Sequence, residues 1–180
     1  MKPIILCLLL LLALGCKTPE ARRPVSHKSG SFIMKSADRN IKLFNAEQAE
    51  IERIIKTQSD AVYIASENGF WYTYNQVAEL DSIVPKFGDI VNYDYDIKDL
   101  SGELIYSKDD LGPQSYAMDQ EELFSGLREG LKLMKVGETV TFLFPSQKAY
   151  GYYGDEDRIG TNVPLMCRVT VNSITKKQSN

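Results

Sequence analysis

Alternating apolar and polar residues constrain the fold of this chain more than any other feature of its sequence. In DIVNYDYDI, residues 89–97, Val, Tyr, Tyr and Ile occupy every second position, and Asn and Asp lie between them. Because a strand points successive side chains to opposite faces, this pattern predicts a strand with one buried face. The turn dipeptides Asn68-Gly69 and Ser101-Gly102 indicate hairpins, so the sheet is predicted to be antiparallel. Further strand-like stretches occur at residues 62–65, 70–74, 103–107, 139–144 and 164–174.

One helix is predicted among these strands. In DQEELFSGLREGLKLM, residues 119–134, apolar side chains recur at helical spacing, and Asp119 can cap the first turn. Many strands with one central helix favour an α+β fold. The recurring apolar residues are Leu123, Phe124, Leu127 and Leu131.

A second, amphipathic helix is predicted before the sheet, over about residues 46–57 of the segment 41–60. Asn45 followed by Gln48 resembles a capping box. The apolar face that follows either packs on the next domain or binds a partner, and the sequence leaves both open. This face contains Ala49, Ile51, Ile54 and Ile55.

The N-terminus is typical of an exported protein. An apolar run of about eleven residues, from Ile4 to Leu14, follows a basic residue. It is shorter than the ~20 residues that a membrane-spanning helix needs, and it is typical of a secretory signal. The run ends in LLALGC, which resembles a bacterial lipoprotein signal and implies cleavage after Gly15 and lipidation of Cys16. A plain signal peptide followed by an ordinary cysteine is the alternative.

Residues 17–40 mix charge, Ser, Pro and Gly with little apolar periodicity, which predicts a flexible tether. We therefore expect an exported protein whose acyl chains on Cys16 insert in the lipid bilayer of a bacterial inner or outer membrane, with its domain in the periplasm. The predicted organisation is a signal peptide at 1–15, the lipidated cysteine and tether at 16–40, a helix at 41–60, a domain at 61–176 and a tail at 177–180.

The predicted domain offers few groups for covalent chemistry. His27, the only histidine, lies in the tether, and Cys167 lies in a strand-like stretch. The acids within 94–99 lack the glycine and distal glutamate of a calcium loop, and the three adjacent acids at 155–157 cannot all face one ion. No metal and no cofactor are therefore predicted. The formal net charge of −3 argues against a nucleic-acid partner.

One reaction needs no reactive side chain, namely rotation about the peptide bond that precedes proline. Its barrier of ~18–20 kcal/mol comes from amide resonance. An enzyme lowers this barrier by holding the twisted amide better than the planar one. An apolar, water-poor pocket of aromatic residues suits this task, with one or two hydrogen bonds to hold the peptide.

The segment from Gly69 to Ile174 resembles the FKBP-type peptidyl-prolyl cis-trans isomerases. The resemblance is carried by KFGDIVNYDYDI, a helix ending in MKVGE, a proline shortly before AYG, and the closing apolar strand. It implies a bent antiparallel sheet wrapped around one helix, and isomerase activity on proline-containing protein clients. With the lipoprotein-like N-terminus, the chain further resembles the lipid-anchored FKBP-type proteins associated with gliding motility in Bacteroidetes. That resemblance implies a membrane-anchored folding factor of the bacterial envelope.

The resemblance also assigns residues to a proline pocket, position by position. It implies catalytic contacts by Tyr95, Phe124 and Tyr150, with the Phe124 N–H and the Tyr150 hydroxyl donating hydrogen bonds to the substrate. The other substrate-binding positions that it implies are Ile105, Tyr106, Leu123, Leu127, Ala149, Ile159 and Cys167.

Three of these positions depart from the family pattern. Ile105 and Tyr106 stand where the family has Phe and Asp, and Cys167 stands where it has Phe. The pocket is therefore expected to be looser and less aromatic. Two functions remain open: a prolyl isomerase, or a non-catalytic FKBP-like binding or chaperone module in an envelope protein complex.

Overall fold

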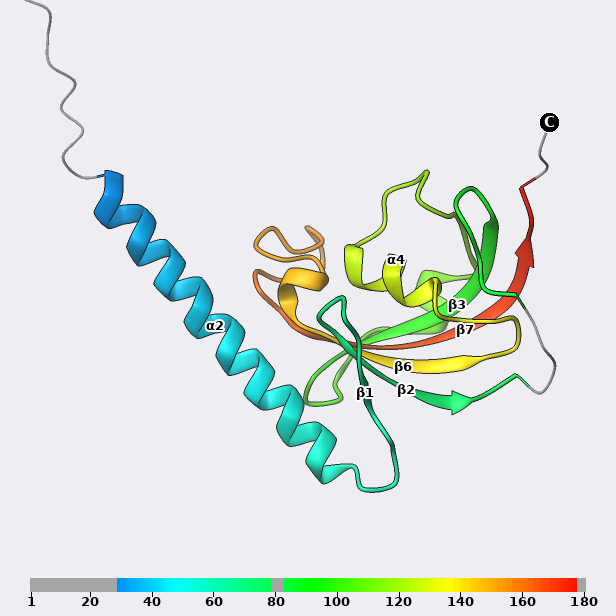
Figure 1. The fold of residues 1–180 in the computed structure, drawn as a ribbon, viewed down its shortest axis with the longest axis horizontal. Helices are drawn as coiled ribbons and strands as arrows, with labels where there is room; N and C mark the ends of the chain where they lie inside the picture. Colours follow the sequence, from blue (N-terminus) through cyan, green and yellow to red (C-terminus); the bar gives the residue numbers. More distant parts are fainter. Residues whose placement is uncertain (1–28, 79–82, 178–180) are drawn as a thin grey trace, which may run out of the picture. The chain divides into compact units, whose positions relative to one another are not determined.

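The computed structural model describes residues 29–78 and 83–177 (Figure 1). The chain divides into two compact units, residues 1–38 and 39–180. The helix α2 (Ser29–Thr57) begins in the first unit and ends in the second. Among the described residues, no helix is both long enough and apolar enough to cross a membrane.

An antiparallel sheet forms most of the second unit, and its order is β1-β2-β6-β7-β3-β4, with β5 also paired to β3. Every strand pair is antiparallel, which confirms the predicted α+β fold. In the described part of the chain the strands are β1 (Ile64–Ala65), β2 (Trp71–Gln76), β3 (Ile90–Asp99), β4 (Leu104–Tyr106), β5 (Gln114–Ala117), β6 (Thr139–Phe144) and β7 (Leu165–Thr175).

The strand β3 follows the alternation in its sequence. Val91, Tyr93 and Ile97 are buried in the main core, as the pattern predicts. Asp94 lies on the opposite face, where its carboxylate pairs with Lys108 Nζ at 2.9 Å. That lysine begins α3 (Lys108–Leu111), a short helix that was not predicted. The pairing holds the pKa of Asp94 below its usual range.

The central helix is shorter than the sequence predicts. It is α4 (Ser125–Leu131), so the helix expected over residues 119–134 was wrong at its start. Asp119 has φ 59° and Phe124 has extended backbone, and neither conformation can continue a helix. Instead of capping the helix, Asp119 pairs with Lys132 Nζ at 3.0 Å. The six residues that precede α4 therefore form a loop.

The helix α4 lies over one face of the sheet (Figure 1), and two of its glycines allow close packing there. A Cβ atom on Gly126 would lie 2.5 Å from the Phe144 ring and 2.7 Å from the backbone oxygen of Lys148. A Cβ atom on Gly130 would lie 2.9 Å from the Phe142 ring. Leu127 and Leu131, on the same helix, are fully buried in the core. The backbone of α4 thus packs directly on the Phe142 and Phe144 rings of β6 and, at Gly126, against the backbone of Lys148.

The helix α2 starts earlier than predicted. The tether expected at 16–40 was wrong for residues 29–40, which are helical; residues 16–28 lie outside the described residues. The expected capping box at Asn45 was also wrong, because Asn45 lies in the middle of the helix. The segment 31–57 contains neither Gly nor Pro, and extending a helix costs far less than starting one.

The C-terminal part of α2 packs on the sheet, as the first of the two open alternatives predicted. Ile51 and Ile54 are buried in a second small core with Leu143 of β6. Ala49, which the pattern placed on the same face, is exposed. The apolar face of the helix is therefore narrower than expected.

Replacing Gly126 by Ala tests the close approach of α4. The added methyl group meets a ring and a backbone oxygen, so we expect a destabilisation of about 1–3 kcal/mol. Gly160→Ala is the matched control, because the nearest atom to its Cβ is 3.9 Å away and its φ is not positive. Urea denaturation measures both variants. Equal free energies of unfolding for Gly126→Ala and the wild type would contradict this packing.

Candidate functional site

A cavity of about 540 Å³ opens beside the N-terminal end of α4. This volume lies in the range of sites that bind small molecules or peptide side chains. Apolar residues form one part of its wall and charged residues form its rim. The cavity is lined by Glu121, Glu122, Leu123, Phe124, Arg128, Ala149 and Tyr150.

Aromatic rings connect this cavity with the core of the domain. The rings of Phe124 and Tyr150 lie 5.1 Å apart between centroids, at a tilt of 46°. The Phe124 ring also meets the Phe144 ring edge-on at 5.5 Å, and Phe144 is stacked on Phe142. These contacts fix the orientation of the cavity wall, since aromatic pairs favour such tilted geometries.

A second tyrosine, Tyr95 on β3, interacts with Tyr150. Burial has the largest effect and raises the pKa of both phenols, so both remain protonated at neutral pH. A protonated phenol carries one O–H donor, which Tyr150 can offer to a ligand in the cavity.

The backbone of Phe124 supplies a second donor at the cavity. Phe124 is the N-cap residue of α4, with φ −60° and ψ 141°. Within residues 29–78 and 83–177, no acceptor is bonded to its N–H group. A buried or half-buried N–H group without a partner favours a ligand that carries a carbonyl oxygen.

The structure brings all ten predicted pocket residues into one core cluster, but only some of them line the cavity. Leu123, Phe124, Ala149 and Tyr150 line the cavity itself. Four others are buried in the core and do not line it: Tyr95, Leu127, Ile159 and Cys167. Burial raises the pKa of the Cys167 thiol, so this group stays a neutral thiol. Whether these ten residues contact a substrate remains a prediction.

The two remaining positions, Ile105 and Tyr106, join the cavity region to the loop that follows it. The Tyr106 hydroxyl donates to Asp155 at 2.6 Å and lies 3.1 Å from Asp157. Arg158 stacks on the Tyr106 ring at 4.8 Å and donates to the backbone oxygen of Ile105 at 3.0 Å. Desolvation and the bond to Asp155 raise the pKa of Tyr106 to about 12. The tyrosine thus anchors the loop.

Asp155 organises that loop. Its carboxylate accepts hydrogen bonds from the N–H groups of Asp157 at 3.0 Å and Ile159 at 2.7 Å. Burial opposes its ionisation, but these bonds and the Tyr106 hydroxyl hold its pKa below the usual range. Among the described residues, no group of acids, His and Cys could hold a metal ion.

Sequence reasoning missed the charged rim of the cavity. Glu121, Glu122 and Arg128 were treated only as parts of a helix, whereas Glu121 lies in the preceding loop. Its carboxylate accepts a hydrogen bond from Ala117 N–H at 3.0 Å, which ties the loop to β5. The predicted lipid-bearing Cys16 lies outside the described residues.

The family model of the FKBP-type peptidyl-prolyl cis-trans isomerases matches residues 82–172, which contain all ten pocket positions. A Neisseria meningitidis protein named "Probable FKBP-type peptidyl-prolyl cis-trans isomerase FkpA" is 34% identical over 91 residues, covering 50% of this chain and 33% of that protein. Bovine "Peptidyl-prolyl cis-trans isomerase FKBP10" is 32% identical over 94 residues, covering 52% of this chain and 16% of that protein. The chain therefore spans about a third and about a sixth of these two relatives.

Solved structures share the fold. FkpA from Escherichia coli matches with a TM-score of 0.61 and 21% identity, over 97% of this chain and 81% of that one. A peptidyl-prolyl cis-trans isomerase from Pseudomonas syringae matches with a TM-score of 0.60 and 20% identity, over 75% of this chain and 95% of that one. At these identities the likeness establishes the fold.

Replacing Tyr106 by Phe tests the anchor of the loop. The variant keeps the ring under Arg158 but loses the hydroxyl that lowers the pKa of Asp155, so that pKa rises. A lowered pKa gives stability above the ordinary pKa of a carboxyl group, and this stability is lost as the pH falls through the folded pKa. The free energy of unfolding therefore falls less in the variant than in the wild type when the pH is lowered through the range in which Asp155 titrates.

Carboxyl ¹³C NMR titration of Asp155 measures this shift. Tyr153→Phe is the control, because Tyr153 is 85% exposed and lies outside the Tyr106 contacts. An unchanged Asp155 titration in Tyr106→Phe would show that the hydroxyl does not act on this carboxylate.

Proposed function

The chain belongs to the FKBP-type peptidyl-prolyl cis-trans isomerase family, and we propose that it catalyses rotation of X–Pro bonds in client polypeptides. The observation that carries the proposal is the cavity beside α4, where an aromatic wall meets two hydrogen-bond donors. These donors are the Phe124 N–H and the Tyr150 hydroxyl. The chain uses no cofactor in this proposal.

The chemistry follows from the barrier to rotation. Amide resonance places partial charge on the carbonyl oxygen, and a twisted amide has less of it. The Phe124 and Tyr150 rings provide an apolar surface that accepts the twisted form better than water does. The two donors hold neighbouring carbonyl groups of the peptide while the X–Pro bond turns.

The positions that depart from the family pattern fit this proposal. Tyr106 replaces an acid, but its hydroxyl is bonded to Asp155, so a carboxylate still lies at this edge. Cys167 leaves less side chain beneath the cavity than a Phe would, but it is fully buried and contributes no exposed polar group. The alternative function is a binding or chaperone module with the same cavity and no turnover.

We further propose that the protein is exported and anchored by acyl chains on Cys16, with its domain on the periplasmic side of an inner or outer membrane. The lipoprotein-like N-terminus supports this location. Several acyl chains would hold the protein firmly, since each buried CH₂ contributes ~0.8 kcal/mol. In that place the protein assists the folding of envelope proteins, including those of the gliding machinery. The link to gliding rests on resemblance.

Replacing Tyr150 by Phe tests the isomerase. Loss of one neutral hydrogen bond of about 0.5–1.5 kcal/mol lowers kcat/KM about two- to ten-fold. NMR exchange spectroscopy on an Ala-Leu-Pro-Phe peptide measures the rate, and Tyr153→Phe is the control with the same chemical change on the surface. A wild-type protein that gives no acceleration at micromolar concentration would exclude the isomerase and leave the binding module.

Replacing Cys16 by Ser tests the anchor separately. The variant loses the thiol that the proposed acyl chains modify, so incorporation of a labelled fatty acid falls to background and the protein leaves the membrane fraction. Cys7→Ser is the matched control, because Cys7 lies within the expected signal peptide. Full labelling of Cys16→Ser would show that this cysteine is not the lipidation site.

A further inference from the structure

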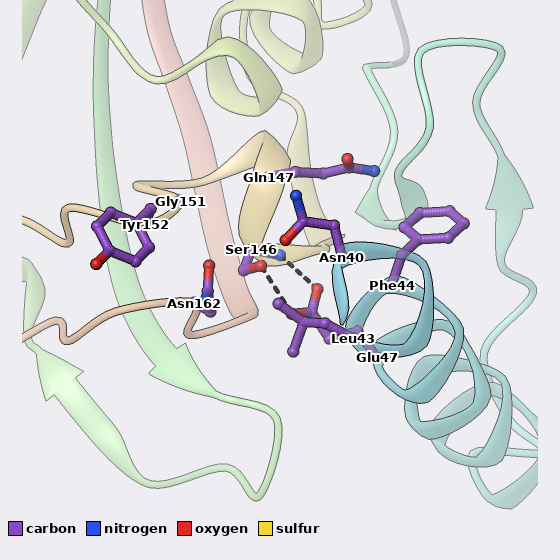
Figure 2. Close-up of a pocket in the computed structure, with 9 residues that line it drawn as sticks. All are labelled: Asn40, Leu43, Phe44, Glu47, Ser146, Gln147, Gly151, Tyr152 and Asn162. Atoms are coloured by element: carbon purple, nitrogen blue, oxygen red, sulfur yellow. Dashed lines mark hydrogen bonds between the residues drawn. The ribbon is translucent and has the colours of Figure 1, made fainter. Parts of the chain in front are cut away.

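A second cavity, of about 310 Å³, lies between α2 and the segment 146–152 (Figure 2). The helix contributes Asn40, Leu43, Phe44 and Glu47, which recur at the spacing of one helical face. All its lining residues belong to the unit 39–180. None of them lines the cavity assigned to proline.

The carboxylate at the floor of this cavity already has hydrogen-bond partners within the protein. Glu47 is only 7% exposed, and its two carboxylate oxygens accept hydrogen bonds from Ser146 N–H at 2.8 Å and Ser146 Oγ at 2.7 Å (Figure 2). Both oxygens of the one charged group in the lining are thus used inside the protein. The cavity therefore suits a neutral ligand rather than a cation.

Unused amide groups surround this floor. The side chains of Asn40, Gln147 and Asn162 line the cavity, and none of them is hydrogen-bonded to any residue within 29–78 or 83–177. Each carries two donors and one acceptor, which is the complement of a peptide group. Leu43 adds apolar surface between them (Figure 2).

Tyr152 completes the wall. It is 71% exposed and contacts the ring of Tyr153, and its role was not apparent from the sequence. An exposed tyrosine on a solvent-facing loop offers a large, rigid contact area at low entropic cost. Tyr, Asn, Ser and Gly are also the residues that adaptable polypeptide-binding surfaces use.

The two cavities share one structural element. Ser146, Gln147, Gly151 and Tyr152 line the second cavity, whereas Ala149 and Tyr150 line the first. Gln147 and Tyr150 are three residues apart, so their Cα atoms lie within about 11 Å. An extended chain advances ~3.3 Å per residue, so about four residues of a client span that distance.

We propose that this second cavity binds the part of the client polypeptide that flanks the proline, through peptide-backbone hydrogen bonds and apolar contacts. The proposal rests on the proposed isomerase function for its client. The Glu47–Ser146 pair holds the shared segment in place for both cavities. A client long enough to occupy both cavities binds more tightly than a short peptide that occupies only the proline cavity.

The experiment compares two substrates on the purified full chain. Ala-Leu-Pro-Phe fills only the proline cavity, and a neutral peptide of about sixteen residues with one central proline reaches both. We expect the long peptide to have a KM at least about five-fold lower than the short one. Equal KM values would overturn the proposal, as would a lower KM for the short peptide.

Two substitutions in the lining of the second cavity, Tyr152→Ala and Leu43→Ala, test whether the lower KM of the long peptide arises there. Each raises the KM of the long peptide about five- to ten-fold and leaves kcat/KM for the short peptide within about two-fold of the wild type. Ile41→Ala is the matched control, because this exposed residue does not line the cavity. Thermal unfolding checks that each variant is folded. Equal effects on both peptides, or an equal effect of the control, would overturn the proposal.

A labelled long peptide with Pro replaced by Ala separates this proposal from the isomerase. Fluorescence anisotropy measures its binding without any turnover. If the short peptide is not isomerised but Tyr152→Ala still weakens binding of this probe, the isomerase fails and the second binding site stands. If the short peptide is isomerised and this probe binds wild type and Tyr152→Ala equally, the second site fails and the isomerase stands.

Discussion

The close approach of α4 to β6 is the constraint on which the candidate site depends. With only hydrogen at the Gly126 Cα, the helix lies against the Phe144 ring and the backbone oxygen of Lys148. That oxygen belongs to the 3₁₀ turn η1 (Ser146–Lys148), which leads directly to Ala149 and Tyr150. The same helix begins at Phe124. One packing contact therefore sets the distance between the two walls of the cavity, and hence the position of both hydrogen-bond donors.

The turn η1 is held from its other side by α2. Glu47 reaches 99 positions along the chain to accept two buried hydrogen bonds from Ser146. Leaving such groups without partners costs about 1–3 kcal/mol each, so this contact strongly favours one position of the turn. A helix that precedes the matched family segment thus helps to position Ala149 and Tyr150, which follow the turn and line the proline cavity within that segment. The rings of Phe124, Phe144 and Phe142 extend the same rigidity into the core.

The sequence predicted those parts of the fold that follow from local periodicity. Val91, Tyr93 and Ile97 alternate along β3, and their burial follows from that pattern alone. The start of α4 could not be predicted in this way, because Leu123 and Phe124 keep helical spacing while Asp119 adopts φ 59°. Their apolar side chains face a cavity rather than a helix interface, and periodicity does not distinguish these environments.

The candidate site shows a further limit of the same reasoning. Position-by-position resemblance named Tyr150 and Phe124, but the contact between their rings, with centroids 5.1 Å apart, is a feature of the three-dimensional structure. The acid that the family has at the Tyr106 position is missing from the strand, but Asp155 approaches that position from 49 residues away. A substitution that removes a carboxylate from one strand can thus be offset by a carboxylate on a neighbouring loop. Departures from a family motif are therefore better judged by which groups meet in space than by which residue occupies one position.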